Sequence, residues 1–465
     1  MTLPWIRRAP GVPYFETDQG EAWTPVGQND ALPWPELRGL LRGDAASVAR
    51  HLAWLREHGV TCLRLMLEYA QSDDCFLERP DGSWNESLVA AWDTFAGLCE
   101  QVGMRLLLTP FDTFFTWIRW ESHPYNRANG GPCLARTDLL ICPETRSRIK
   151  RRLDFATRRW GASGAVFAWD IWNEMHPAQG SDQPGCFEDF IGDVAPFLRL
   201  VERRAHGRAH PLCASVFGPE LEWKPWLRAP IFRHPALDFA STHLYDEGTI
   251  DDPADTVAPA LAVGRLMADA LGEITDQRPL FDSEHGPIYT FKDKGITLPE
   301  AFDDEYFRHT SWAHLASGGA GGGMRWPNRN PHALTPGMRR LQRAMSGFLP
   351  LVDWRRFGRR CLNGELRVEG GAVAALGCGD ADQAVVYLLR RAPLLEDGRV
   401  DPCQAQPVHV TVPGLGDGVF RAVLWHTGEG RRLGEARVRR QDGGLRIGPL
   451  NVGADLAVAV RRDRA

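Results

Sequence analysis

Several features that would assign this chain to a class at once are missing from it. Its 465 residues include ten cysteines, but none forms a C-x-x-C pair or has the cysteine and histidine spacing of a zinc site. Cys62, Cys142 and Cys213 lie inside apolar runs, which is typical of reduced and buried thiols. No run of apolar residues is long enough to cross a membrane. The sequence therefore predicts no disulfide framework, no zinc site and no membrane span.

A surplus of positive charge is missing as well. The 54 lysines and arginines are outnumbered by 59 aspartates and glutamates, which gives a formal net charge of −5. Because proteins that bind nucleic acids carry a basic patch or stripe, a nucleic-acid partner is not expected. The first ten residues also lack the apolar core of a signal peptide. We therefore expect a cytoplasmic protein with no nucleic-acid or membrane partner.

The chain does contain two apolar runs that end in polar residues. Residues 165–177 read AVFAWDIWNEMHP, where the apolar part gives way to Asn173, Glu174 and His176. Residues 278–287 read RPLFDSEHGP and carry Glu284 near their end. Runs of this kind are typical of buried parallel strands that deliver side chains to one rim of a sheet. Two carboxylates at such a rim suit the cleavage of a glycosidic bond, one as acid and one as nucleophile or base.

At these residues the sequence resembles the clan A glycoside hydrolases, the cellulase-like and mannanase-like group that includes family 5. In that group an Asn-Glu pair ends the fourth barrel strand and supplies the acid/base, and a lone glutamate ends the seventh strand as the nucleophile. The resemblance assigns these roles to Glu174 and Glu284. It implies a retaining hydrolase of β-linked oligo- or polysaccharides that uses no cofactor and no metal. Taken alone, Glu174 would be explained better as a carboxylate at a strand end that caps the next helix.

The resemblance extends to residues around the two glutamates. Asn173 corresponds to an asparagine that hydrogen-bonds the sugar 2-hydroxyl group, although an asparagine at a strand end is also a common loop cap. Arg64 and Tyr245 correspond to residues that contact the nucleophile and keep it ionised. The alternative for Arg64 is a structural ion pair with Asp170 or Asp282.

His243 and Trp326 complete the resemblance. His243 corresponds to the histidine of strand six, a hydroxyl partner near the acid/base, and Trp326 to the tryptophan that floors the central sugar subsite. Typical family 5 members also place a histidine near the end of strand three, where this chain reads Phe-Asp-Thr at residues 111–113. His123 in the following loop is our candidate to replace that histidine.

Four further residues are candidate sugar contacts from their positions. Counting by two along residues 60–69 places Glu68 on the same face as Arg64, and Asp112 follows strand three directly. Both carboxylates would either bind sugar hydroxyls or form structural salt bridges. Trp117 and Trp120 lie in a long aromatic loop, and they either wall a sugar site or pack the loop onto the rest of the fold.

Alternating strand and helix patterns predict an α/β fold, a (β/α)₈ TIM barrel, over residues 1–352. A turn at residues 18–20 predicts a capping hairpin before the first strand, and glycines such as Gly59 and Gly103 end the helices. The strands are expected within residues 23–29, 60–69, 104–110, 165–177, 211–218, 237–245, 278–287 and 317–327. Helices are expected within residues 50–58, 89–102, 145–160 and 305–316. The segment 317–327 is rich in glycine, which is a poor strand former.

The pattern changes after residue 352. Residues 353–465 contain short alternating runs separated by glycine-rich turns, with no helical periodicity between them. They predict a small all-β sandwich whose role is structural rather than sugar binding. Its strands are expected at 365–368, 373–376, 384–389, 407–412, 420–425, 436–439 and 456–460.

Three other functions are alternatives to hydrolysis. A transglycosylase on the same scaffold would share the motifs and differ in its products. A carbohydrate-binding barrel that has lost activity would not need both glutamates, and both are present. A metal-dependent barrel hydrolase would need clustered ligands such as His-x-His at the end of strand one, where residues 27–29 read Gly-Gln-Asn.

Overall fold

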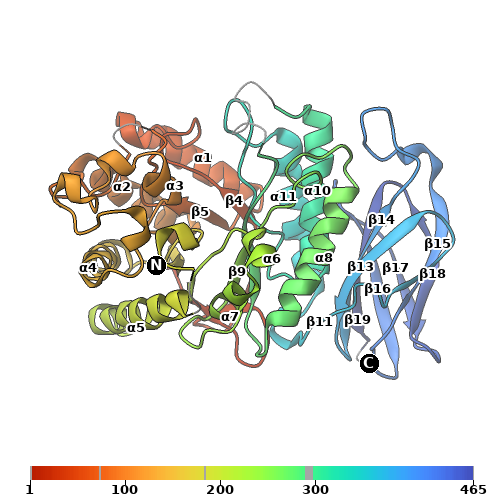
Figure 1. Ribbon diagram of the computed structural model, residues 1–465. Helices are drawn as coiled ribbons and strands as arrows, with labels where there is room; N and C mark the ends of the chain where they lie inside the picture. Colours follow the sequence, from red (N-terminus) through yellow and green to blue (C-terminus); the bar gives the residue numbers. More distant parts are fainter. Residues whose placement is uncertain (1–2, 73–74, 183–184, 289–296, 464–465) are drawn as a thin grey trace.

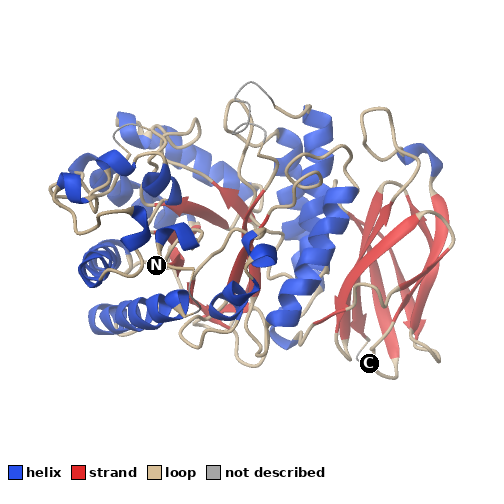
Figure 2. Ribbon diagram, viewed as in Figure 1, coloured by secondary structure: helices blue, strands red, loops and turns tan. Residues whose placement is uncertain are grey.

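The computed structural model describes residues 3–463, except for residues 73–74, 183–184 and 289–296. Figure 1 shows parallel strands wrapped by helices in the first part of the chain, and Figure 2 shows a C-terminal part built almost entirely of strands. The expected succession of an α/β unit and a β unit is confirmed. Among the described residues, no helix is both long and apolar enough to span a membrane.

A small antiparallel sheet precedes the parallel strands. Its order is β1-β2-β3, and the turn between β2 and β3 is closed by a hydrogen bond from Gly20 N to Thr17 O. Gly20 has a φ of 81°, a conformation that glycine adopts without strain. The predicted hairpin at residues 18–20 is therefore present. The strands are β1 Ile6–Arg8, β2 Phe15–Thr17 and β3 Ala22–Trp23.

Seven parallel strands follow in chain order. Five of them form one sheet, and β9 and β10 form a second. An isolated parallel bridge between Phe217 and His243 links the two sheets on one side. At the first strand, Gly27 lies so close to its neighbour that a Cβ there would approach Cys62 O to 1.7 Å. The strands are β4 Gly27–Asn29, β5 Cys62–Met66, β6 Arg105–Thr109, β7 Val166–Asp170, β8 Leu212–Cys213, β9 Ala240–Leu244 and β10 Leu280–His285.

The expected eighth strand is not a regular strand. In residues 317–327, Arg325 alone forms parallel bridges, to His285 on one side and to Gln28 on the other. The glycines of this segment fit close approaches: a Cβ on Gly321 would lie 2.6 Å from Pro25 O. Since several of these glycines have positive φ, a continuous extended ladder cannot form here.

The helices predicted from periodicity are present and begin earlier than expected. Asp44 accepts a hydrogen bond from Ser47 N and so caps the first helix, whereas Gly103 ends the second in the left-handed conformation. Between β8 and β9 the chain forms only the short α-helices α6 and α7, with the 3₁₀ helix Pro225–Leu227 between them. The helices are α1 Ala45–Glu57, α2 Glu86–Val102, α3 Thr113–Trp117, α4 Pro143–Trp160, α5 Cys186–His206, α6 Glu220–Trp223, α7 Arg228–Phe232, α8 Ala258–Glu273, α10 Glu300–Ala316 and α11 Pro336–Phe348.

Two antiparallel sheets make up the C-terminal part. One has the order β11-β13-β14-β19-β16-β17 and the other β12-β15-β18. The sequence patterns did not predict β11 or β18; the latter contains Gly448 and Pro449, which interrupt its alternation. The strands are β11 Arg360–Cys361, β12 Arg367–Glu369, β13 Val373–Gly379, β14 Gln383–Arg390, β15 Gln406–Val412, β16 Val419–His426, β17 Arg431–Arg439, β18 Leu445–Val452 and β19 Asp455–Arg462.

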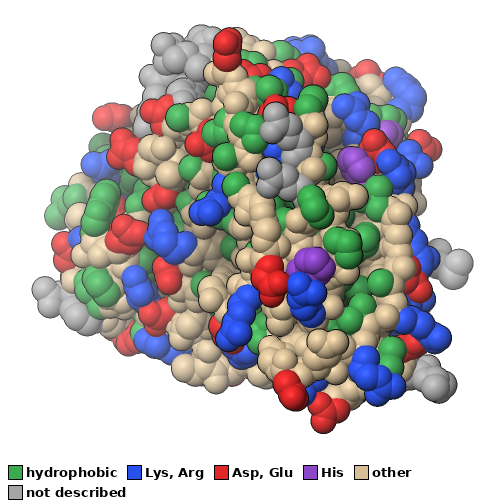
Figure 3. Space-filling model, turned by 90° about the vertical axis from the view of Figure 1, so that its right-hand side faces the viewer, with side chains coloured by type: hydrophobic (Ala, Val, Ile, Leu, Met, Phe, Trp, Pro, Cys, Tyr) green, Lys and Arg blue, Asp and Glu red, His purple; other side chains and the backbone are tan. Residues whose placement is uncertain are grey.

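The larger antiparallel sheet packs on the helices of the first part. Tyr387 of β14 and Trp425 of β16 belong to the same hydrophobic core as Trp312 of α10. An ion pair of 3.1 Å joins Arg308 Nε of α10 to Asp455 Oδ1 of β19. Figure 3 shows the face that lies on the right-hand side of Figure 1, where basic and acidic side chains are interspersed.

Candidate functional site

A cavity of about 410 Å³ and one of about 310 Å³ adjoin each other at one end of the parallel strands. The smaller one, here called the main cavity, contains both glutamates singled out from the sequence. Its walls come from the carboxyl ends of several strands, as in sites built on parallel α/β sheets. The lining residues are Trp34, Met66, Tyr69, Gln71, Thr113, Phe114, Trp117, Glu174, His176, Phe217, Glu220, Tyr245, Glu284, Ile288 and Trp326.

Glu174 stands four residues beyond the end of β7 in an unusual backbone conformation. Its φ is 49°, which makes it the only non-glycine residue with positive φ in the described part of the chain. The backbone N–H of Glu174 donates to Ser215 Oγ at 3.1 Å. Such conformations cost free energy and collect where surrounding contacts over-determine the backbone. Here the contact with Ser215 helps to turn the Glu174 side chain into the main cavity.

The environment of Glu174 favours its protonated form. Burial raises the pKa of Glu174 to about 7, Arg64 opposes this rise, and Asp170 adds to it. Its Oε1 lies 2.7 Å from Nδ1 of His243. Burial also lowers the pKa of His243, so the imidazole is neutral near pH 7. A carboxyl group of this kind is suited to give a proton at neutral pH.

Glu284 has a different environment because two donors meet its carboxylate. Arg64 Nη1 donates to Oε2 at 2.9 Å, and the Tyr245 hydroxyl donates to Oε1 at 2.9 Å. Burial and the two neighbouring glutamates raise the pKa of Tyr245 well above its usual value, so its phenol keeps the proton that it donates. Donors aimed at both oxygens stabilise the ionised form of a carboxylate.

Arg64 ties the strands together beneath the main cavity. It lies fully buried in β5 and donates from Nη2 to Asp170 Oδ2 at 3.0 Å and to Asn173 Oδ1 at 2.7 Å. Both sequence interpretations of Arg64 thus hold, since it contacts Glu284 and pairs with Asp170. Asn173 is itself buried beside the main cavity, and its amide nitrogen donates to Thr113 Oγ1 at 3.0 Å.

His243 stands between the two glutamates. Its Nδ1 is 2.7 Å from Glu174 Oε1 and 3.6 Å from Glu284 Oε2, while Nε2 lies 3.1 Å from Ser283 Oγ. One carboxylate oxygen of each glutamate lies within 4.8 Å of the other. Two carboxyl groups about 5–5.5 Å apart are typical of retaining glycosidases, and a wider gap is typical of inverting ones.

The same three side chains are the only trio of close metal-ligand atoms found among the described residues. A cation bound to Glu174, His243 and Glu284 would compete with the guanidinium of Arg64, which already donates to Glu284. Like charges held this close repel in a buried site. The donor set therefore fits a carboxylate pair held by Arg64 better than a metal centre.

Aromatic side chains form the opposite wall of the main cavity. Trp326 packs edge-on against Trp34, with ring centroids 5.0 Å apart, and Trp34 packs in the same way on Tyr69. Trp326 therefore lines the cavity, as the resemblance implied. Trp117 also lines it and packs edge-on against His176. Flat aromatic surfaces of this kind suit the apolar faces of sugar rings.

Asn173 and His243 are buried beside the main cavity and do not line it. Four more predicted sugar contacts do not line it either, and the first two are the carboxylates Glu68 and Asp112. Glu68 is buried and pairs with Arg152 Nη1 at 2.8 Å. Asp112 accepts hydrogen bonds from Ala70 N and Phe114 N, both at 2.8 Å, and caps α3. Both residues lie beyond the last residue of their strands, so counting by two no longer gives the direction of their side chains.

The other two are His123 and Trp120. His123 is buried between aromatic rings, and its Nδ1 accepts a hydrogen bond from Tyr125 N at 3.0 Å. The Trp120 ring packs against His123 at 5.3 Å. These contacts hold the long loop together, which was the alternative interpretation for the loop aromatics. His123 therefore packs inside the loop and does not line the main cavity.

Several lining residues were not predicted. His176 follows Glu174 by two residues, and its Nε2 lies 3.0 Å from Glu220 Oε1 of α6. Its presence in the Asn-Glu-Met-His segment was the available signal. Trp34, Tyr69 and Phe217 come from loops, where no periodicity shows which way a side chain points.

The sequence matches no protein-family model and no curated protein. Solved structures resemble the chain more clearly. A glycoside hydrolase matches with a TM-score of 0.56 and 13% identity over 99% of this chain and 98% of its own. A family 5 glycoside hydrolase from Bacteroides vulgatus matches with a TM-score of 0.58 and 12% identity over 99% of this chain and 95% of its own.

A third similar structure is a family 5 mannosidase from Rhizomucor miehei. It matches with a TM-score of 0.52 and 15% identity over 76% of this chain and 99% of its own. The first two matches extend over both parts of this chain. At these identities the likeness is one of fold, so the roles of individual residues rest on the geometry given above.

Proposed function

We propose that this chain is a retaining glycoside hydrolase that cleaves β-glycosidic bonds in oligo- or polysaccharides. It has the clan A fold of family 5 glycoside hydrolases. The observation that carries the proposal is a pair of glutamates in unlike environments, with one carboxylate oxygen of each within 4.8 Å of the other. Glu174 is the acid/base and Glu284 the nucleophile. In this proposal Arg325 and its two bridges close the strands into a (β/α)₈ barrel, which brings the glutamates to one rim.

The first step forms a glycosyl-enzyme. A carboxylate oxygen of Glu284 attacks the anomeric carbon, and the bond from that carbon to the glycosidic oxygen breaks. Glu174 gives its proton to that oxygen, so the leaving group departs as an alcohol. Arg64 and Tyr245 hold the Glu284 carboxylate in position before the attack.

The second step releases the sugar. Glu174, now a carboxylate, takes a proton from water while the water oxygen attacks the anomeric carbon. The ester bond to Glu284 breaks, which returns both glutamates to their starting states and retains the configuration of the sugar. His243 Nδ1 can accept a hydrogen bond from protonated Glu174 and can donate one to Glu174 when it is a carboxylate.

Substrate binding follows from the walls of the main cavity. Trp326 and the aromatic residues beside it form a platform for the sugar ring at the anomeric centre. Trp117 extends this surface at the mouth. Asn173 uses one of its two amide N–H groups on Thr113, and the second is proposed to meet the sugar 2-hydroxyl.

Two variants test the roles of the glutamates. Glu284→Gln is expected to abolish turnover of every glycoside. Glu174→Ala should retain hydrolysis of aryl glycosides with good leaving groups, and added azide should raise its rate by giving a β-glycosyl azide. The rates are measured on a panel of aryl β-glycosides, and product configuration is followed by NMR.

The matched control is Glu57→Gln, which removes an exposed carboxylate of α1 and should leave all rates unchanged. Circular dichroism establishes that each variant is folded. Equal losses in both glutamate variants on activated substrates, without rescue by azide, would show that the two roles are assigned wrongly.

A further inference from the structure

Glu220 and His176 form a pair inside the main cavity that the proposed mechanism does not use. His176 Nε2 lies 3.0 Å from Glu220 Oε1, and both side chains line the main cavity. Glu220 is only 7% exposed. Since Glu220 does not line the neighbouring cavity of about 410 Å³, the exposed part of its carboxylate faces the main cavity.

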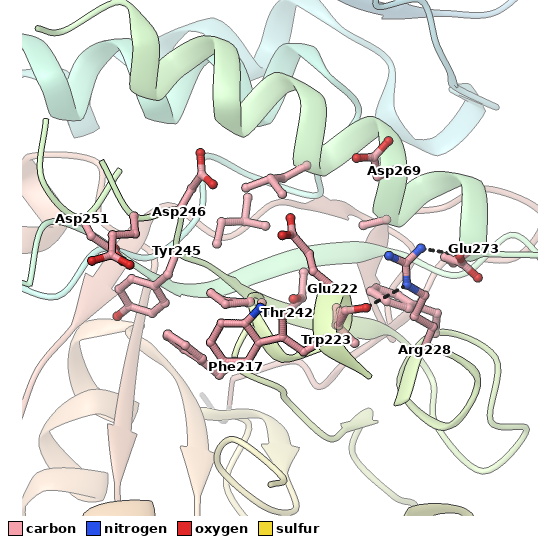
Figure 4. A pocket seen from close by; sticks show the side chains of 18 of the residues that line it. Phe217, Glu222, Trp223, Arg228, Thr242, Tyr245, Asp246, Asp251, Asp269 and Glu273 are labelled. Carbon is pink, nitrogen blue, oxygen red and sulfur yellow. Dashed lines mark hydrogen bonds and ion pairs between the residues drawn. The ribbon is translucent and has the colours of Figure 1, made fainter. Parts of the chain in front are cut away.

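The short helix α6 contributes residues to both cavities. Glu222 and Trp223 line the larger cavity (Figure 4), whereas Glu220, the first residue of the helix, lines the main cavity. The turn before the helix is held against β9, because Gly218 N donates to His243 O at 2.9 Å. A Cβ on Gly218 would lie 2.4 Å from that oxygen, so only glycine allows this close approach. The backbone that carries Glu220 is therefore fixed beside β9.

His176 is held in place by its own neighbours. Its Nδ1 accepts a hydrogen bond from Ala178 N at 3.0 Å, and its backbone N–H donates to Gln179 Oε1 at 3.2 Å. Because Nδ1 accepts, the ring is neutral and carries its proton on Nε2, which donates to Glu220 Oε1. The ring also packs edge-on against Trp117. One oxygen of Glu220 is thus bound by a donor whose orientation is fixed.

The second carboxylate oxygen of Glu220 has no donor of its own. Oε2 accepts no hydrogen bond from any residue that the structure describes, and it keeps solvent access through the main cavity. Phe114, Trp117 and Phe217 line the same cavity, whereas no described lysine or arginine does. An acceptor that carries charge is costly to leave unpaired in apolar surroundings. Glu220 Oε2 is therefore a binding position for a hydrogen-bond donor.

The pair lies on the leaving-group side of Glu174. In the proposed reaction the transferred sugar rests on Trp326, and Glu174 protonates the oxygen between this sugar and the leaving group. Trp326 lies in the segment beside β4 and β10, whereas His176 and Glu220 come after β7 and β8. Burial raises the pKa of Glu174, and His176 is close enough to oppose this rise. A leaving group bound at Glu174 therefore extends toward His176 and Glu220.

A sugar suits this place better than an apolar group does. A ligand that displaces water from a charged acceptor loses affinity unless it replaces the hydrogen bonds of that water. A sugar ring supplies hydroxyl donors for Glu220 Oε2 and an apolar face for Trp117. We infer that Glu220, positioned by His176, determines the specificity of a leaving-group subsite that takes a sugar ring. This inference rests on the proposed function, and it makes the substrate an oligo- or polysaccharide rather than a glycoside of an apolar alcohol.

Matched leaving groups test the inference. For the sugar that the aryl glycosides identify as best, β-1,3- and β-1,4-linked disaccharides with glucose as leaving group are compared with the cyclohexyl β-glycoside, whose leaving ring has no further hydroxyl. Glu220→Gln keeps the shape of the side chain and an oxygen for His176, but it removes the charge. It is expected to lower kcat/KM for the better disaccharide by about tenfold, mostly through a higher KM. The value for the cyclohexyl glycoside should not change.

Glu222→Gln is the matched control, because it removes a carboxylate of the same helix that lines the larger cavity. It should change neither value. Each substrate is compared with itself between proteins, so differences in leaving-group chemistry cancel. Equal losses on both substrates in Glu220→Gln would show a purely structural role, and no loss on either would show that Glu220 does not contact the substrate. Both outcomes overturn the inference, while hydrolysis of aryl glycosides upholds the proposed function.

A binding measurement separates the inference from catalysis. Cellobiose and β-1,4-mannobiose are titrated by calorimetry into the Glu284→Gln variant, which is expected not to turn them over. Saturable binding of at least one disaccharide is expected, weakened severalfold by the additional Glu220→Gln change and unaffected by Glu222→Gln. If the natural protein hydrolyses no aryl glycoside, the proposed function fails, and this titration still decides the subsite. No binding of either disaccharide, or binding that Glu220→Gln leaves unchanged, would overturn the inference.

Discussion

At the scale of single residues, Glu174 differs from Glu284 through its neighbours. Glu284 receives two hydrogen bonds from Arg64 and Tyr245, whereas Glu174 meets a neutral imidazole in a buried setting. In the proposed mechanism these neighbours make one carboxyl group the acid/base and the other the nucleophile, without any difference in their own chemistry. The positive φ of Glu174 adds a backbone cost that a purely structural residue would not need to bear.

The raised pKa of Glu174 predicts the direction of the pH dependence. Because Glu174 must carry a proton to act as acid, kcat/KM for glycosides with poor leaving groups should fall above pH of about 7, by about tenfold per pH unit. Aryl glycosides with good leaving groups need little protonation of the leaving oxygen. The decrease of their kcat/KM above pH 7 should therefore be smaller. The profiles are measured from pH 5 to 9 for both substrate types.

The Glu174→Ala variant is the control for this pH dependence. It lacks the titrating group, so its slow hydrolysis of activated glycosides should show no alkaline limb near pH 7. If the rate of this variant fell with the same midpoint as in the natural protein, the titrating group would be a different residue.

Residues within strands were predictable, and residues just beyond strand ends were predictable only in part. Arg64 and His243 lie inside regular strands, where alternation gives the direction of a side chain. Glu68 lies two residues past β5, and the chain there has already turned toward Arg152. Tyr245 also follows its strand, and the family resemblance placed this residue beside the nucleophile.

At the scale of elements, helix α4 is anchored by charge beneath the long aromatic loop. Arg152 of α4 donates to Glu68 Oε1 at 2.8 Å and to Glu78 Oε2 at 3.1 Å, and all three side chains are buried. Arg151 also pairs with Glu78. A buried cluster of this kind is costly to break, because the remaining partners are left without compensation.

Glu68→Gln is therefore expected to lower stability and leave substrate binding unchanged. The loss should be about 3 kcal/mol of unfolding free energy, since Arg152 loses a charged partner and Leu77 N loses an acceptor. Denaturant unfolding gives the stability, and steady-state kinetics on the best glycoside gives KM. A raised KM at unchanged stability would show that Glu68 binds the sugar and is not a structural residue.

Elements with one clear period were predictable from the sequence. Helix α2 keeps one helical period and ends at Gly103, and strand β14 is a continuous apolar run. Strand β8 shrinks to two residues, because the chain leaves the sheet to shape the wall around Phe217. Strand β18 escaped prediction since Gly448 and Pro449 conceal its alternation.

At the scale of the whole molecule, the two parts of the chain share one hydrophobic core. Val385, Leu389 and Ala457 of the antiparallel sheet belong to the core that also contains residues of α8 and α10. Trp425 Nε1 donates to Ala344 O of α11 at 3.1 Å, and Asn363 Nδ2 to Gly264 O of α8 at 2.9 Å. An interface with shared core residues couples the folding of both parts.

Deletion of residues 353–465 is expected to leave an insoluble or poorly folded first part, because it uncovers apolar side chains of α8, α10 and α11. The full chain should melt in one calorimetric transition. Arg439→Ala on the exposed edge strand β17 is the control and should not change the melting temperature. A truncated protein that stays soluble, with unchanged kcat and weaker oligosaccharide binding, would make the C-terminal part a binding module.

The bridge between Arg325 and Gln28 bears on where the structure opens locally. On its β4 side, the backbone contact of segment 317–327 is one hydrogen bond from Asn29 N to Arg325 O at 2.9 Å, with Asn29 Nδ2 donating to Met324 O beside it. Neighbouring β5 and β6 instead share a ladder of five residue pairs. Local opening costs least where few hydrogen bonds must break together, so the Asn29 amide should exchange its hydrogen faster than those of β5. Hydrogen-exchange mass spectrometry would then show faster exchange at Asn29 than in β5, at the place where solvent water enters the interior from the rim.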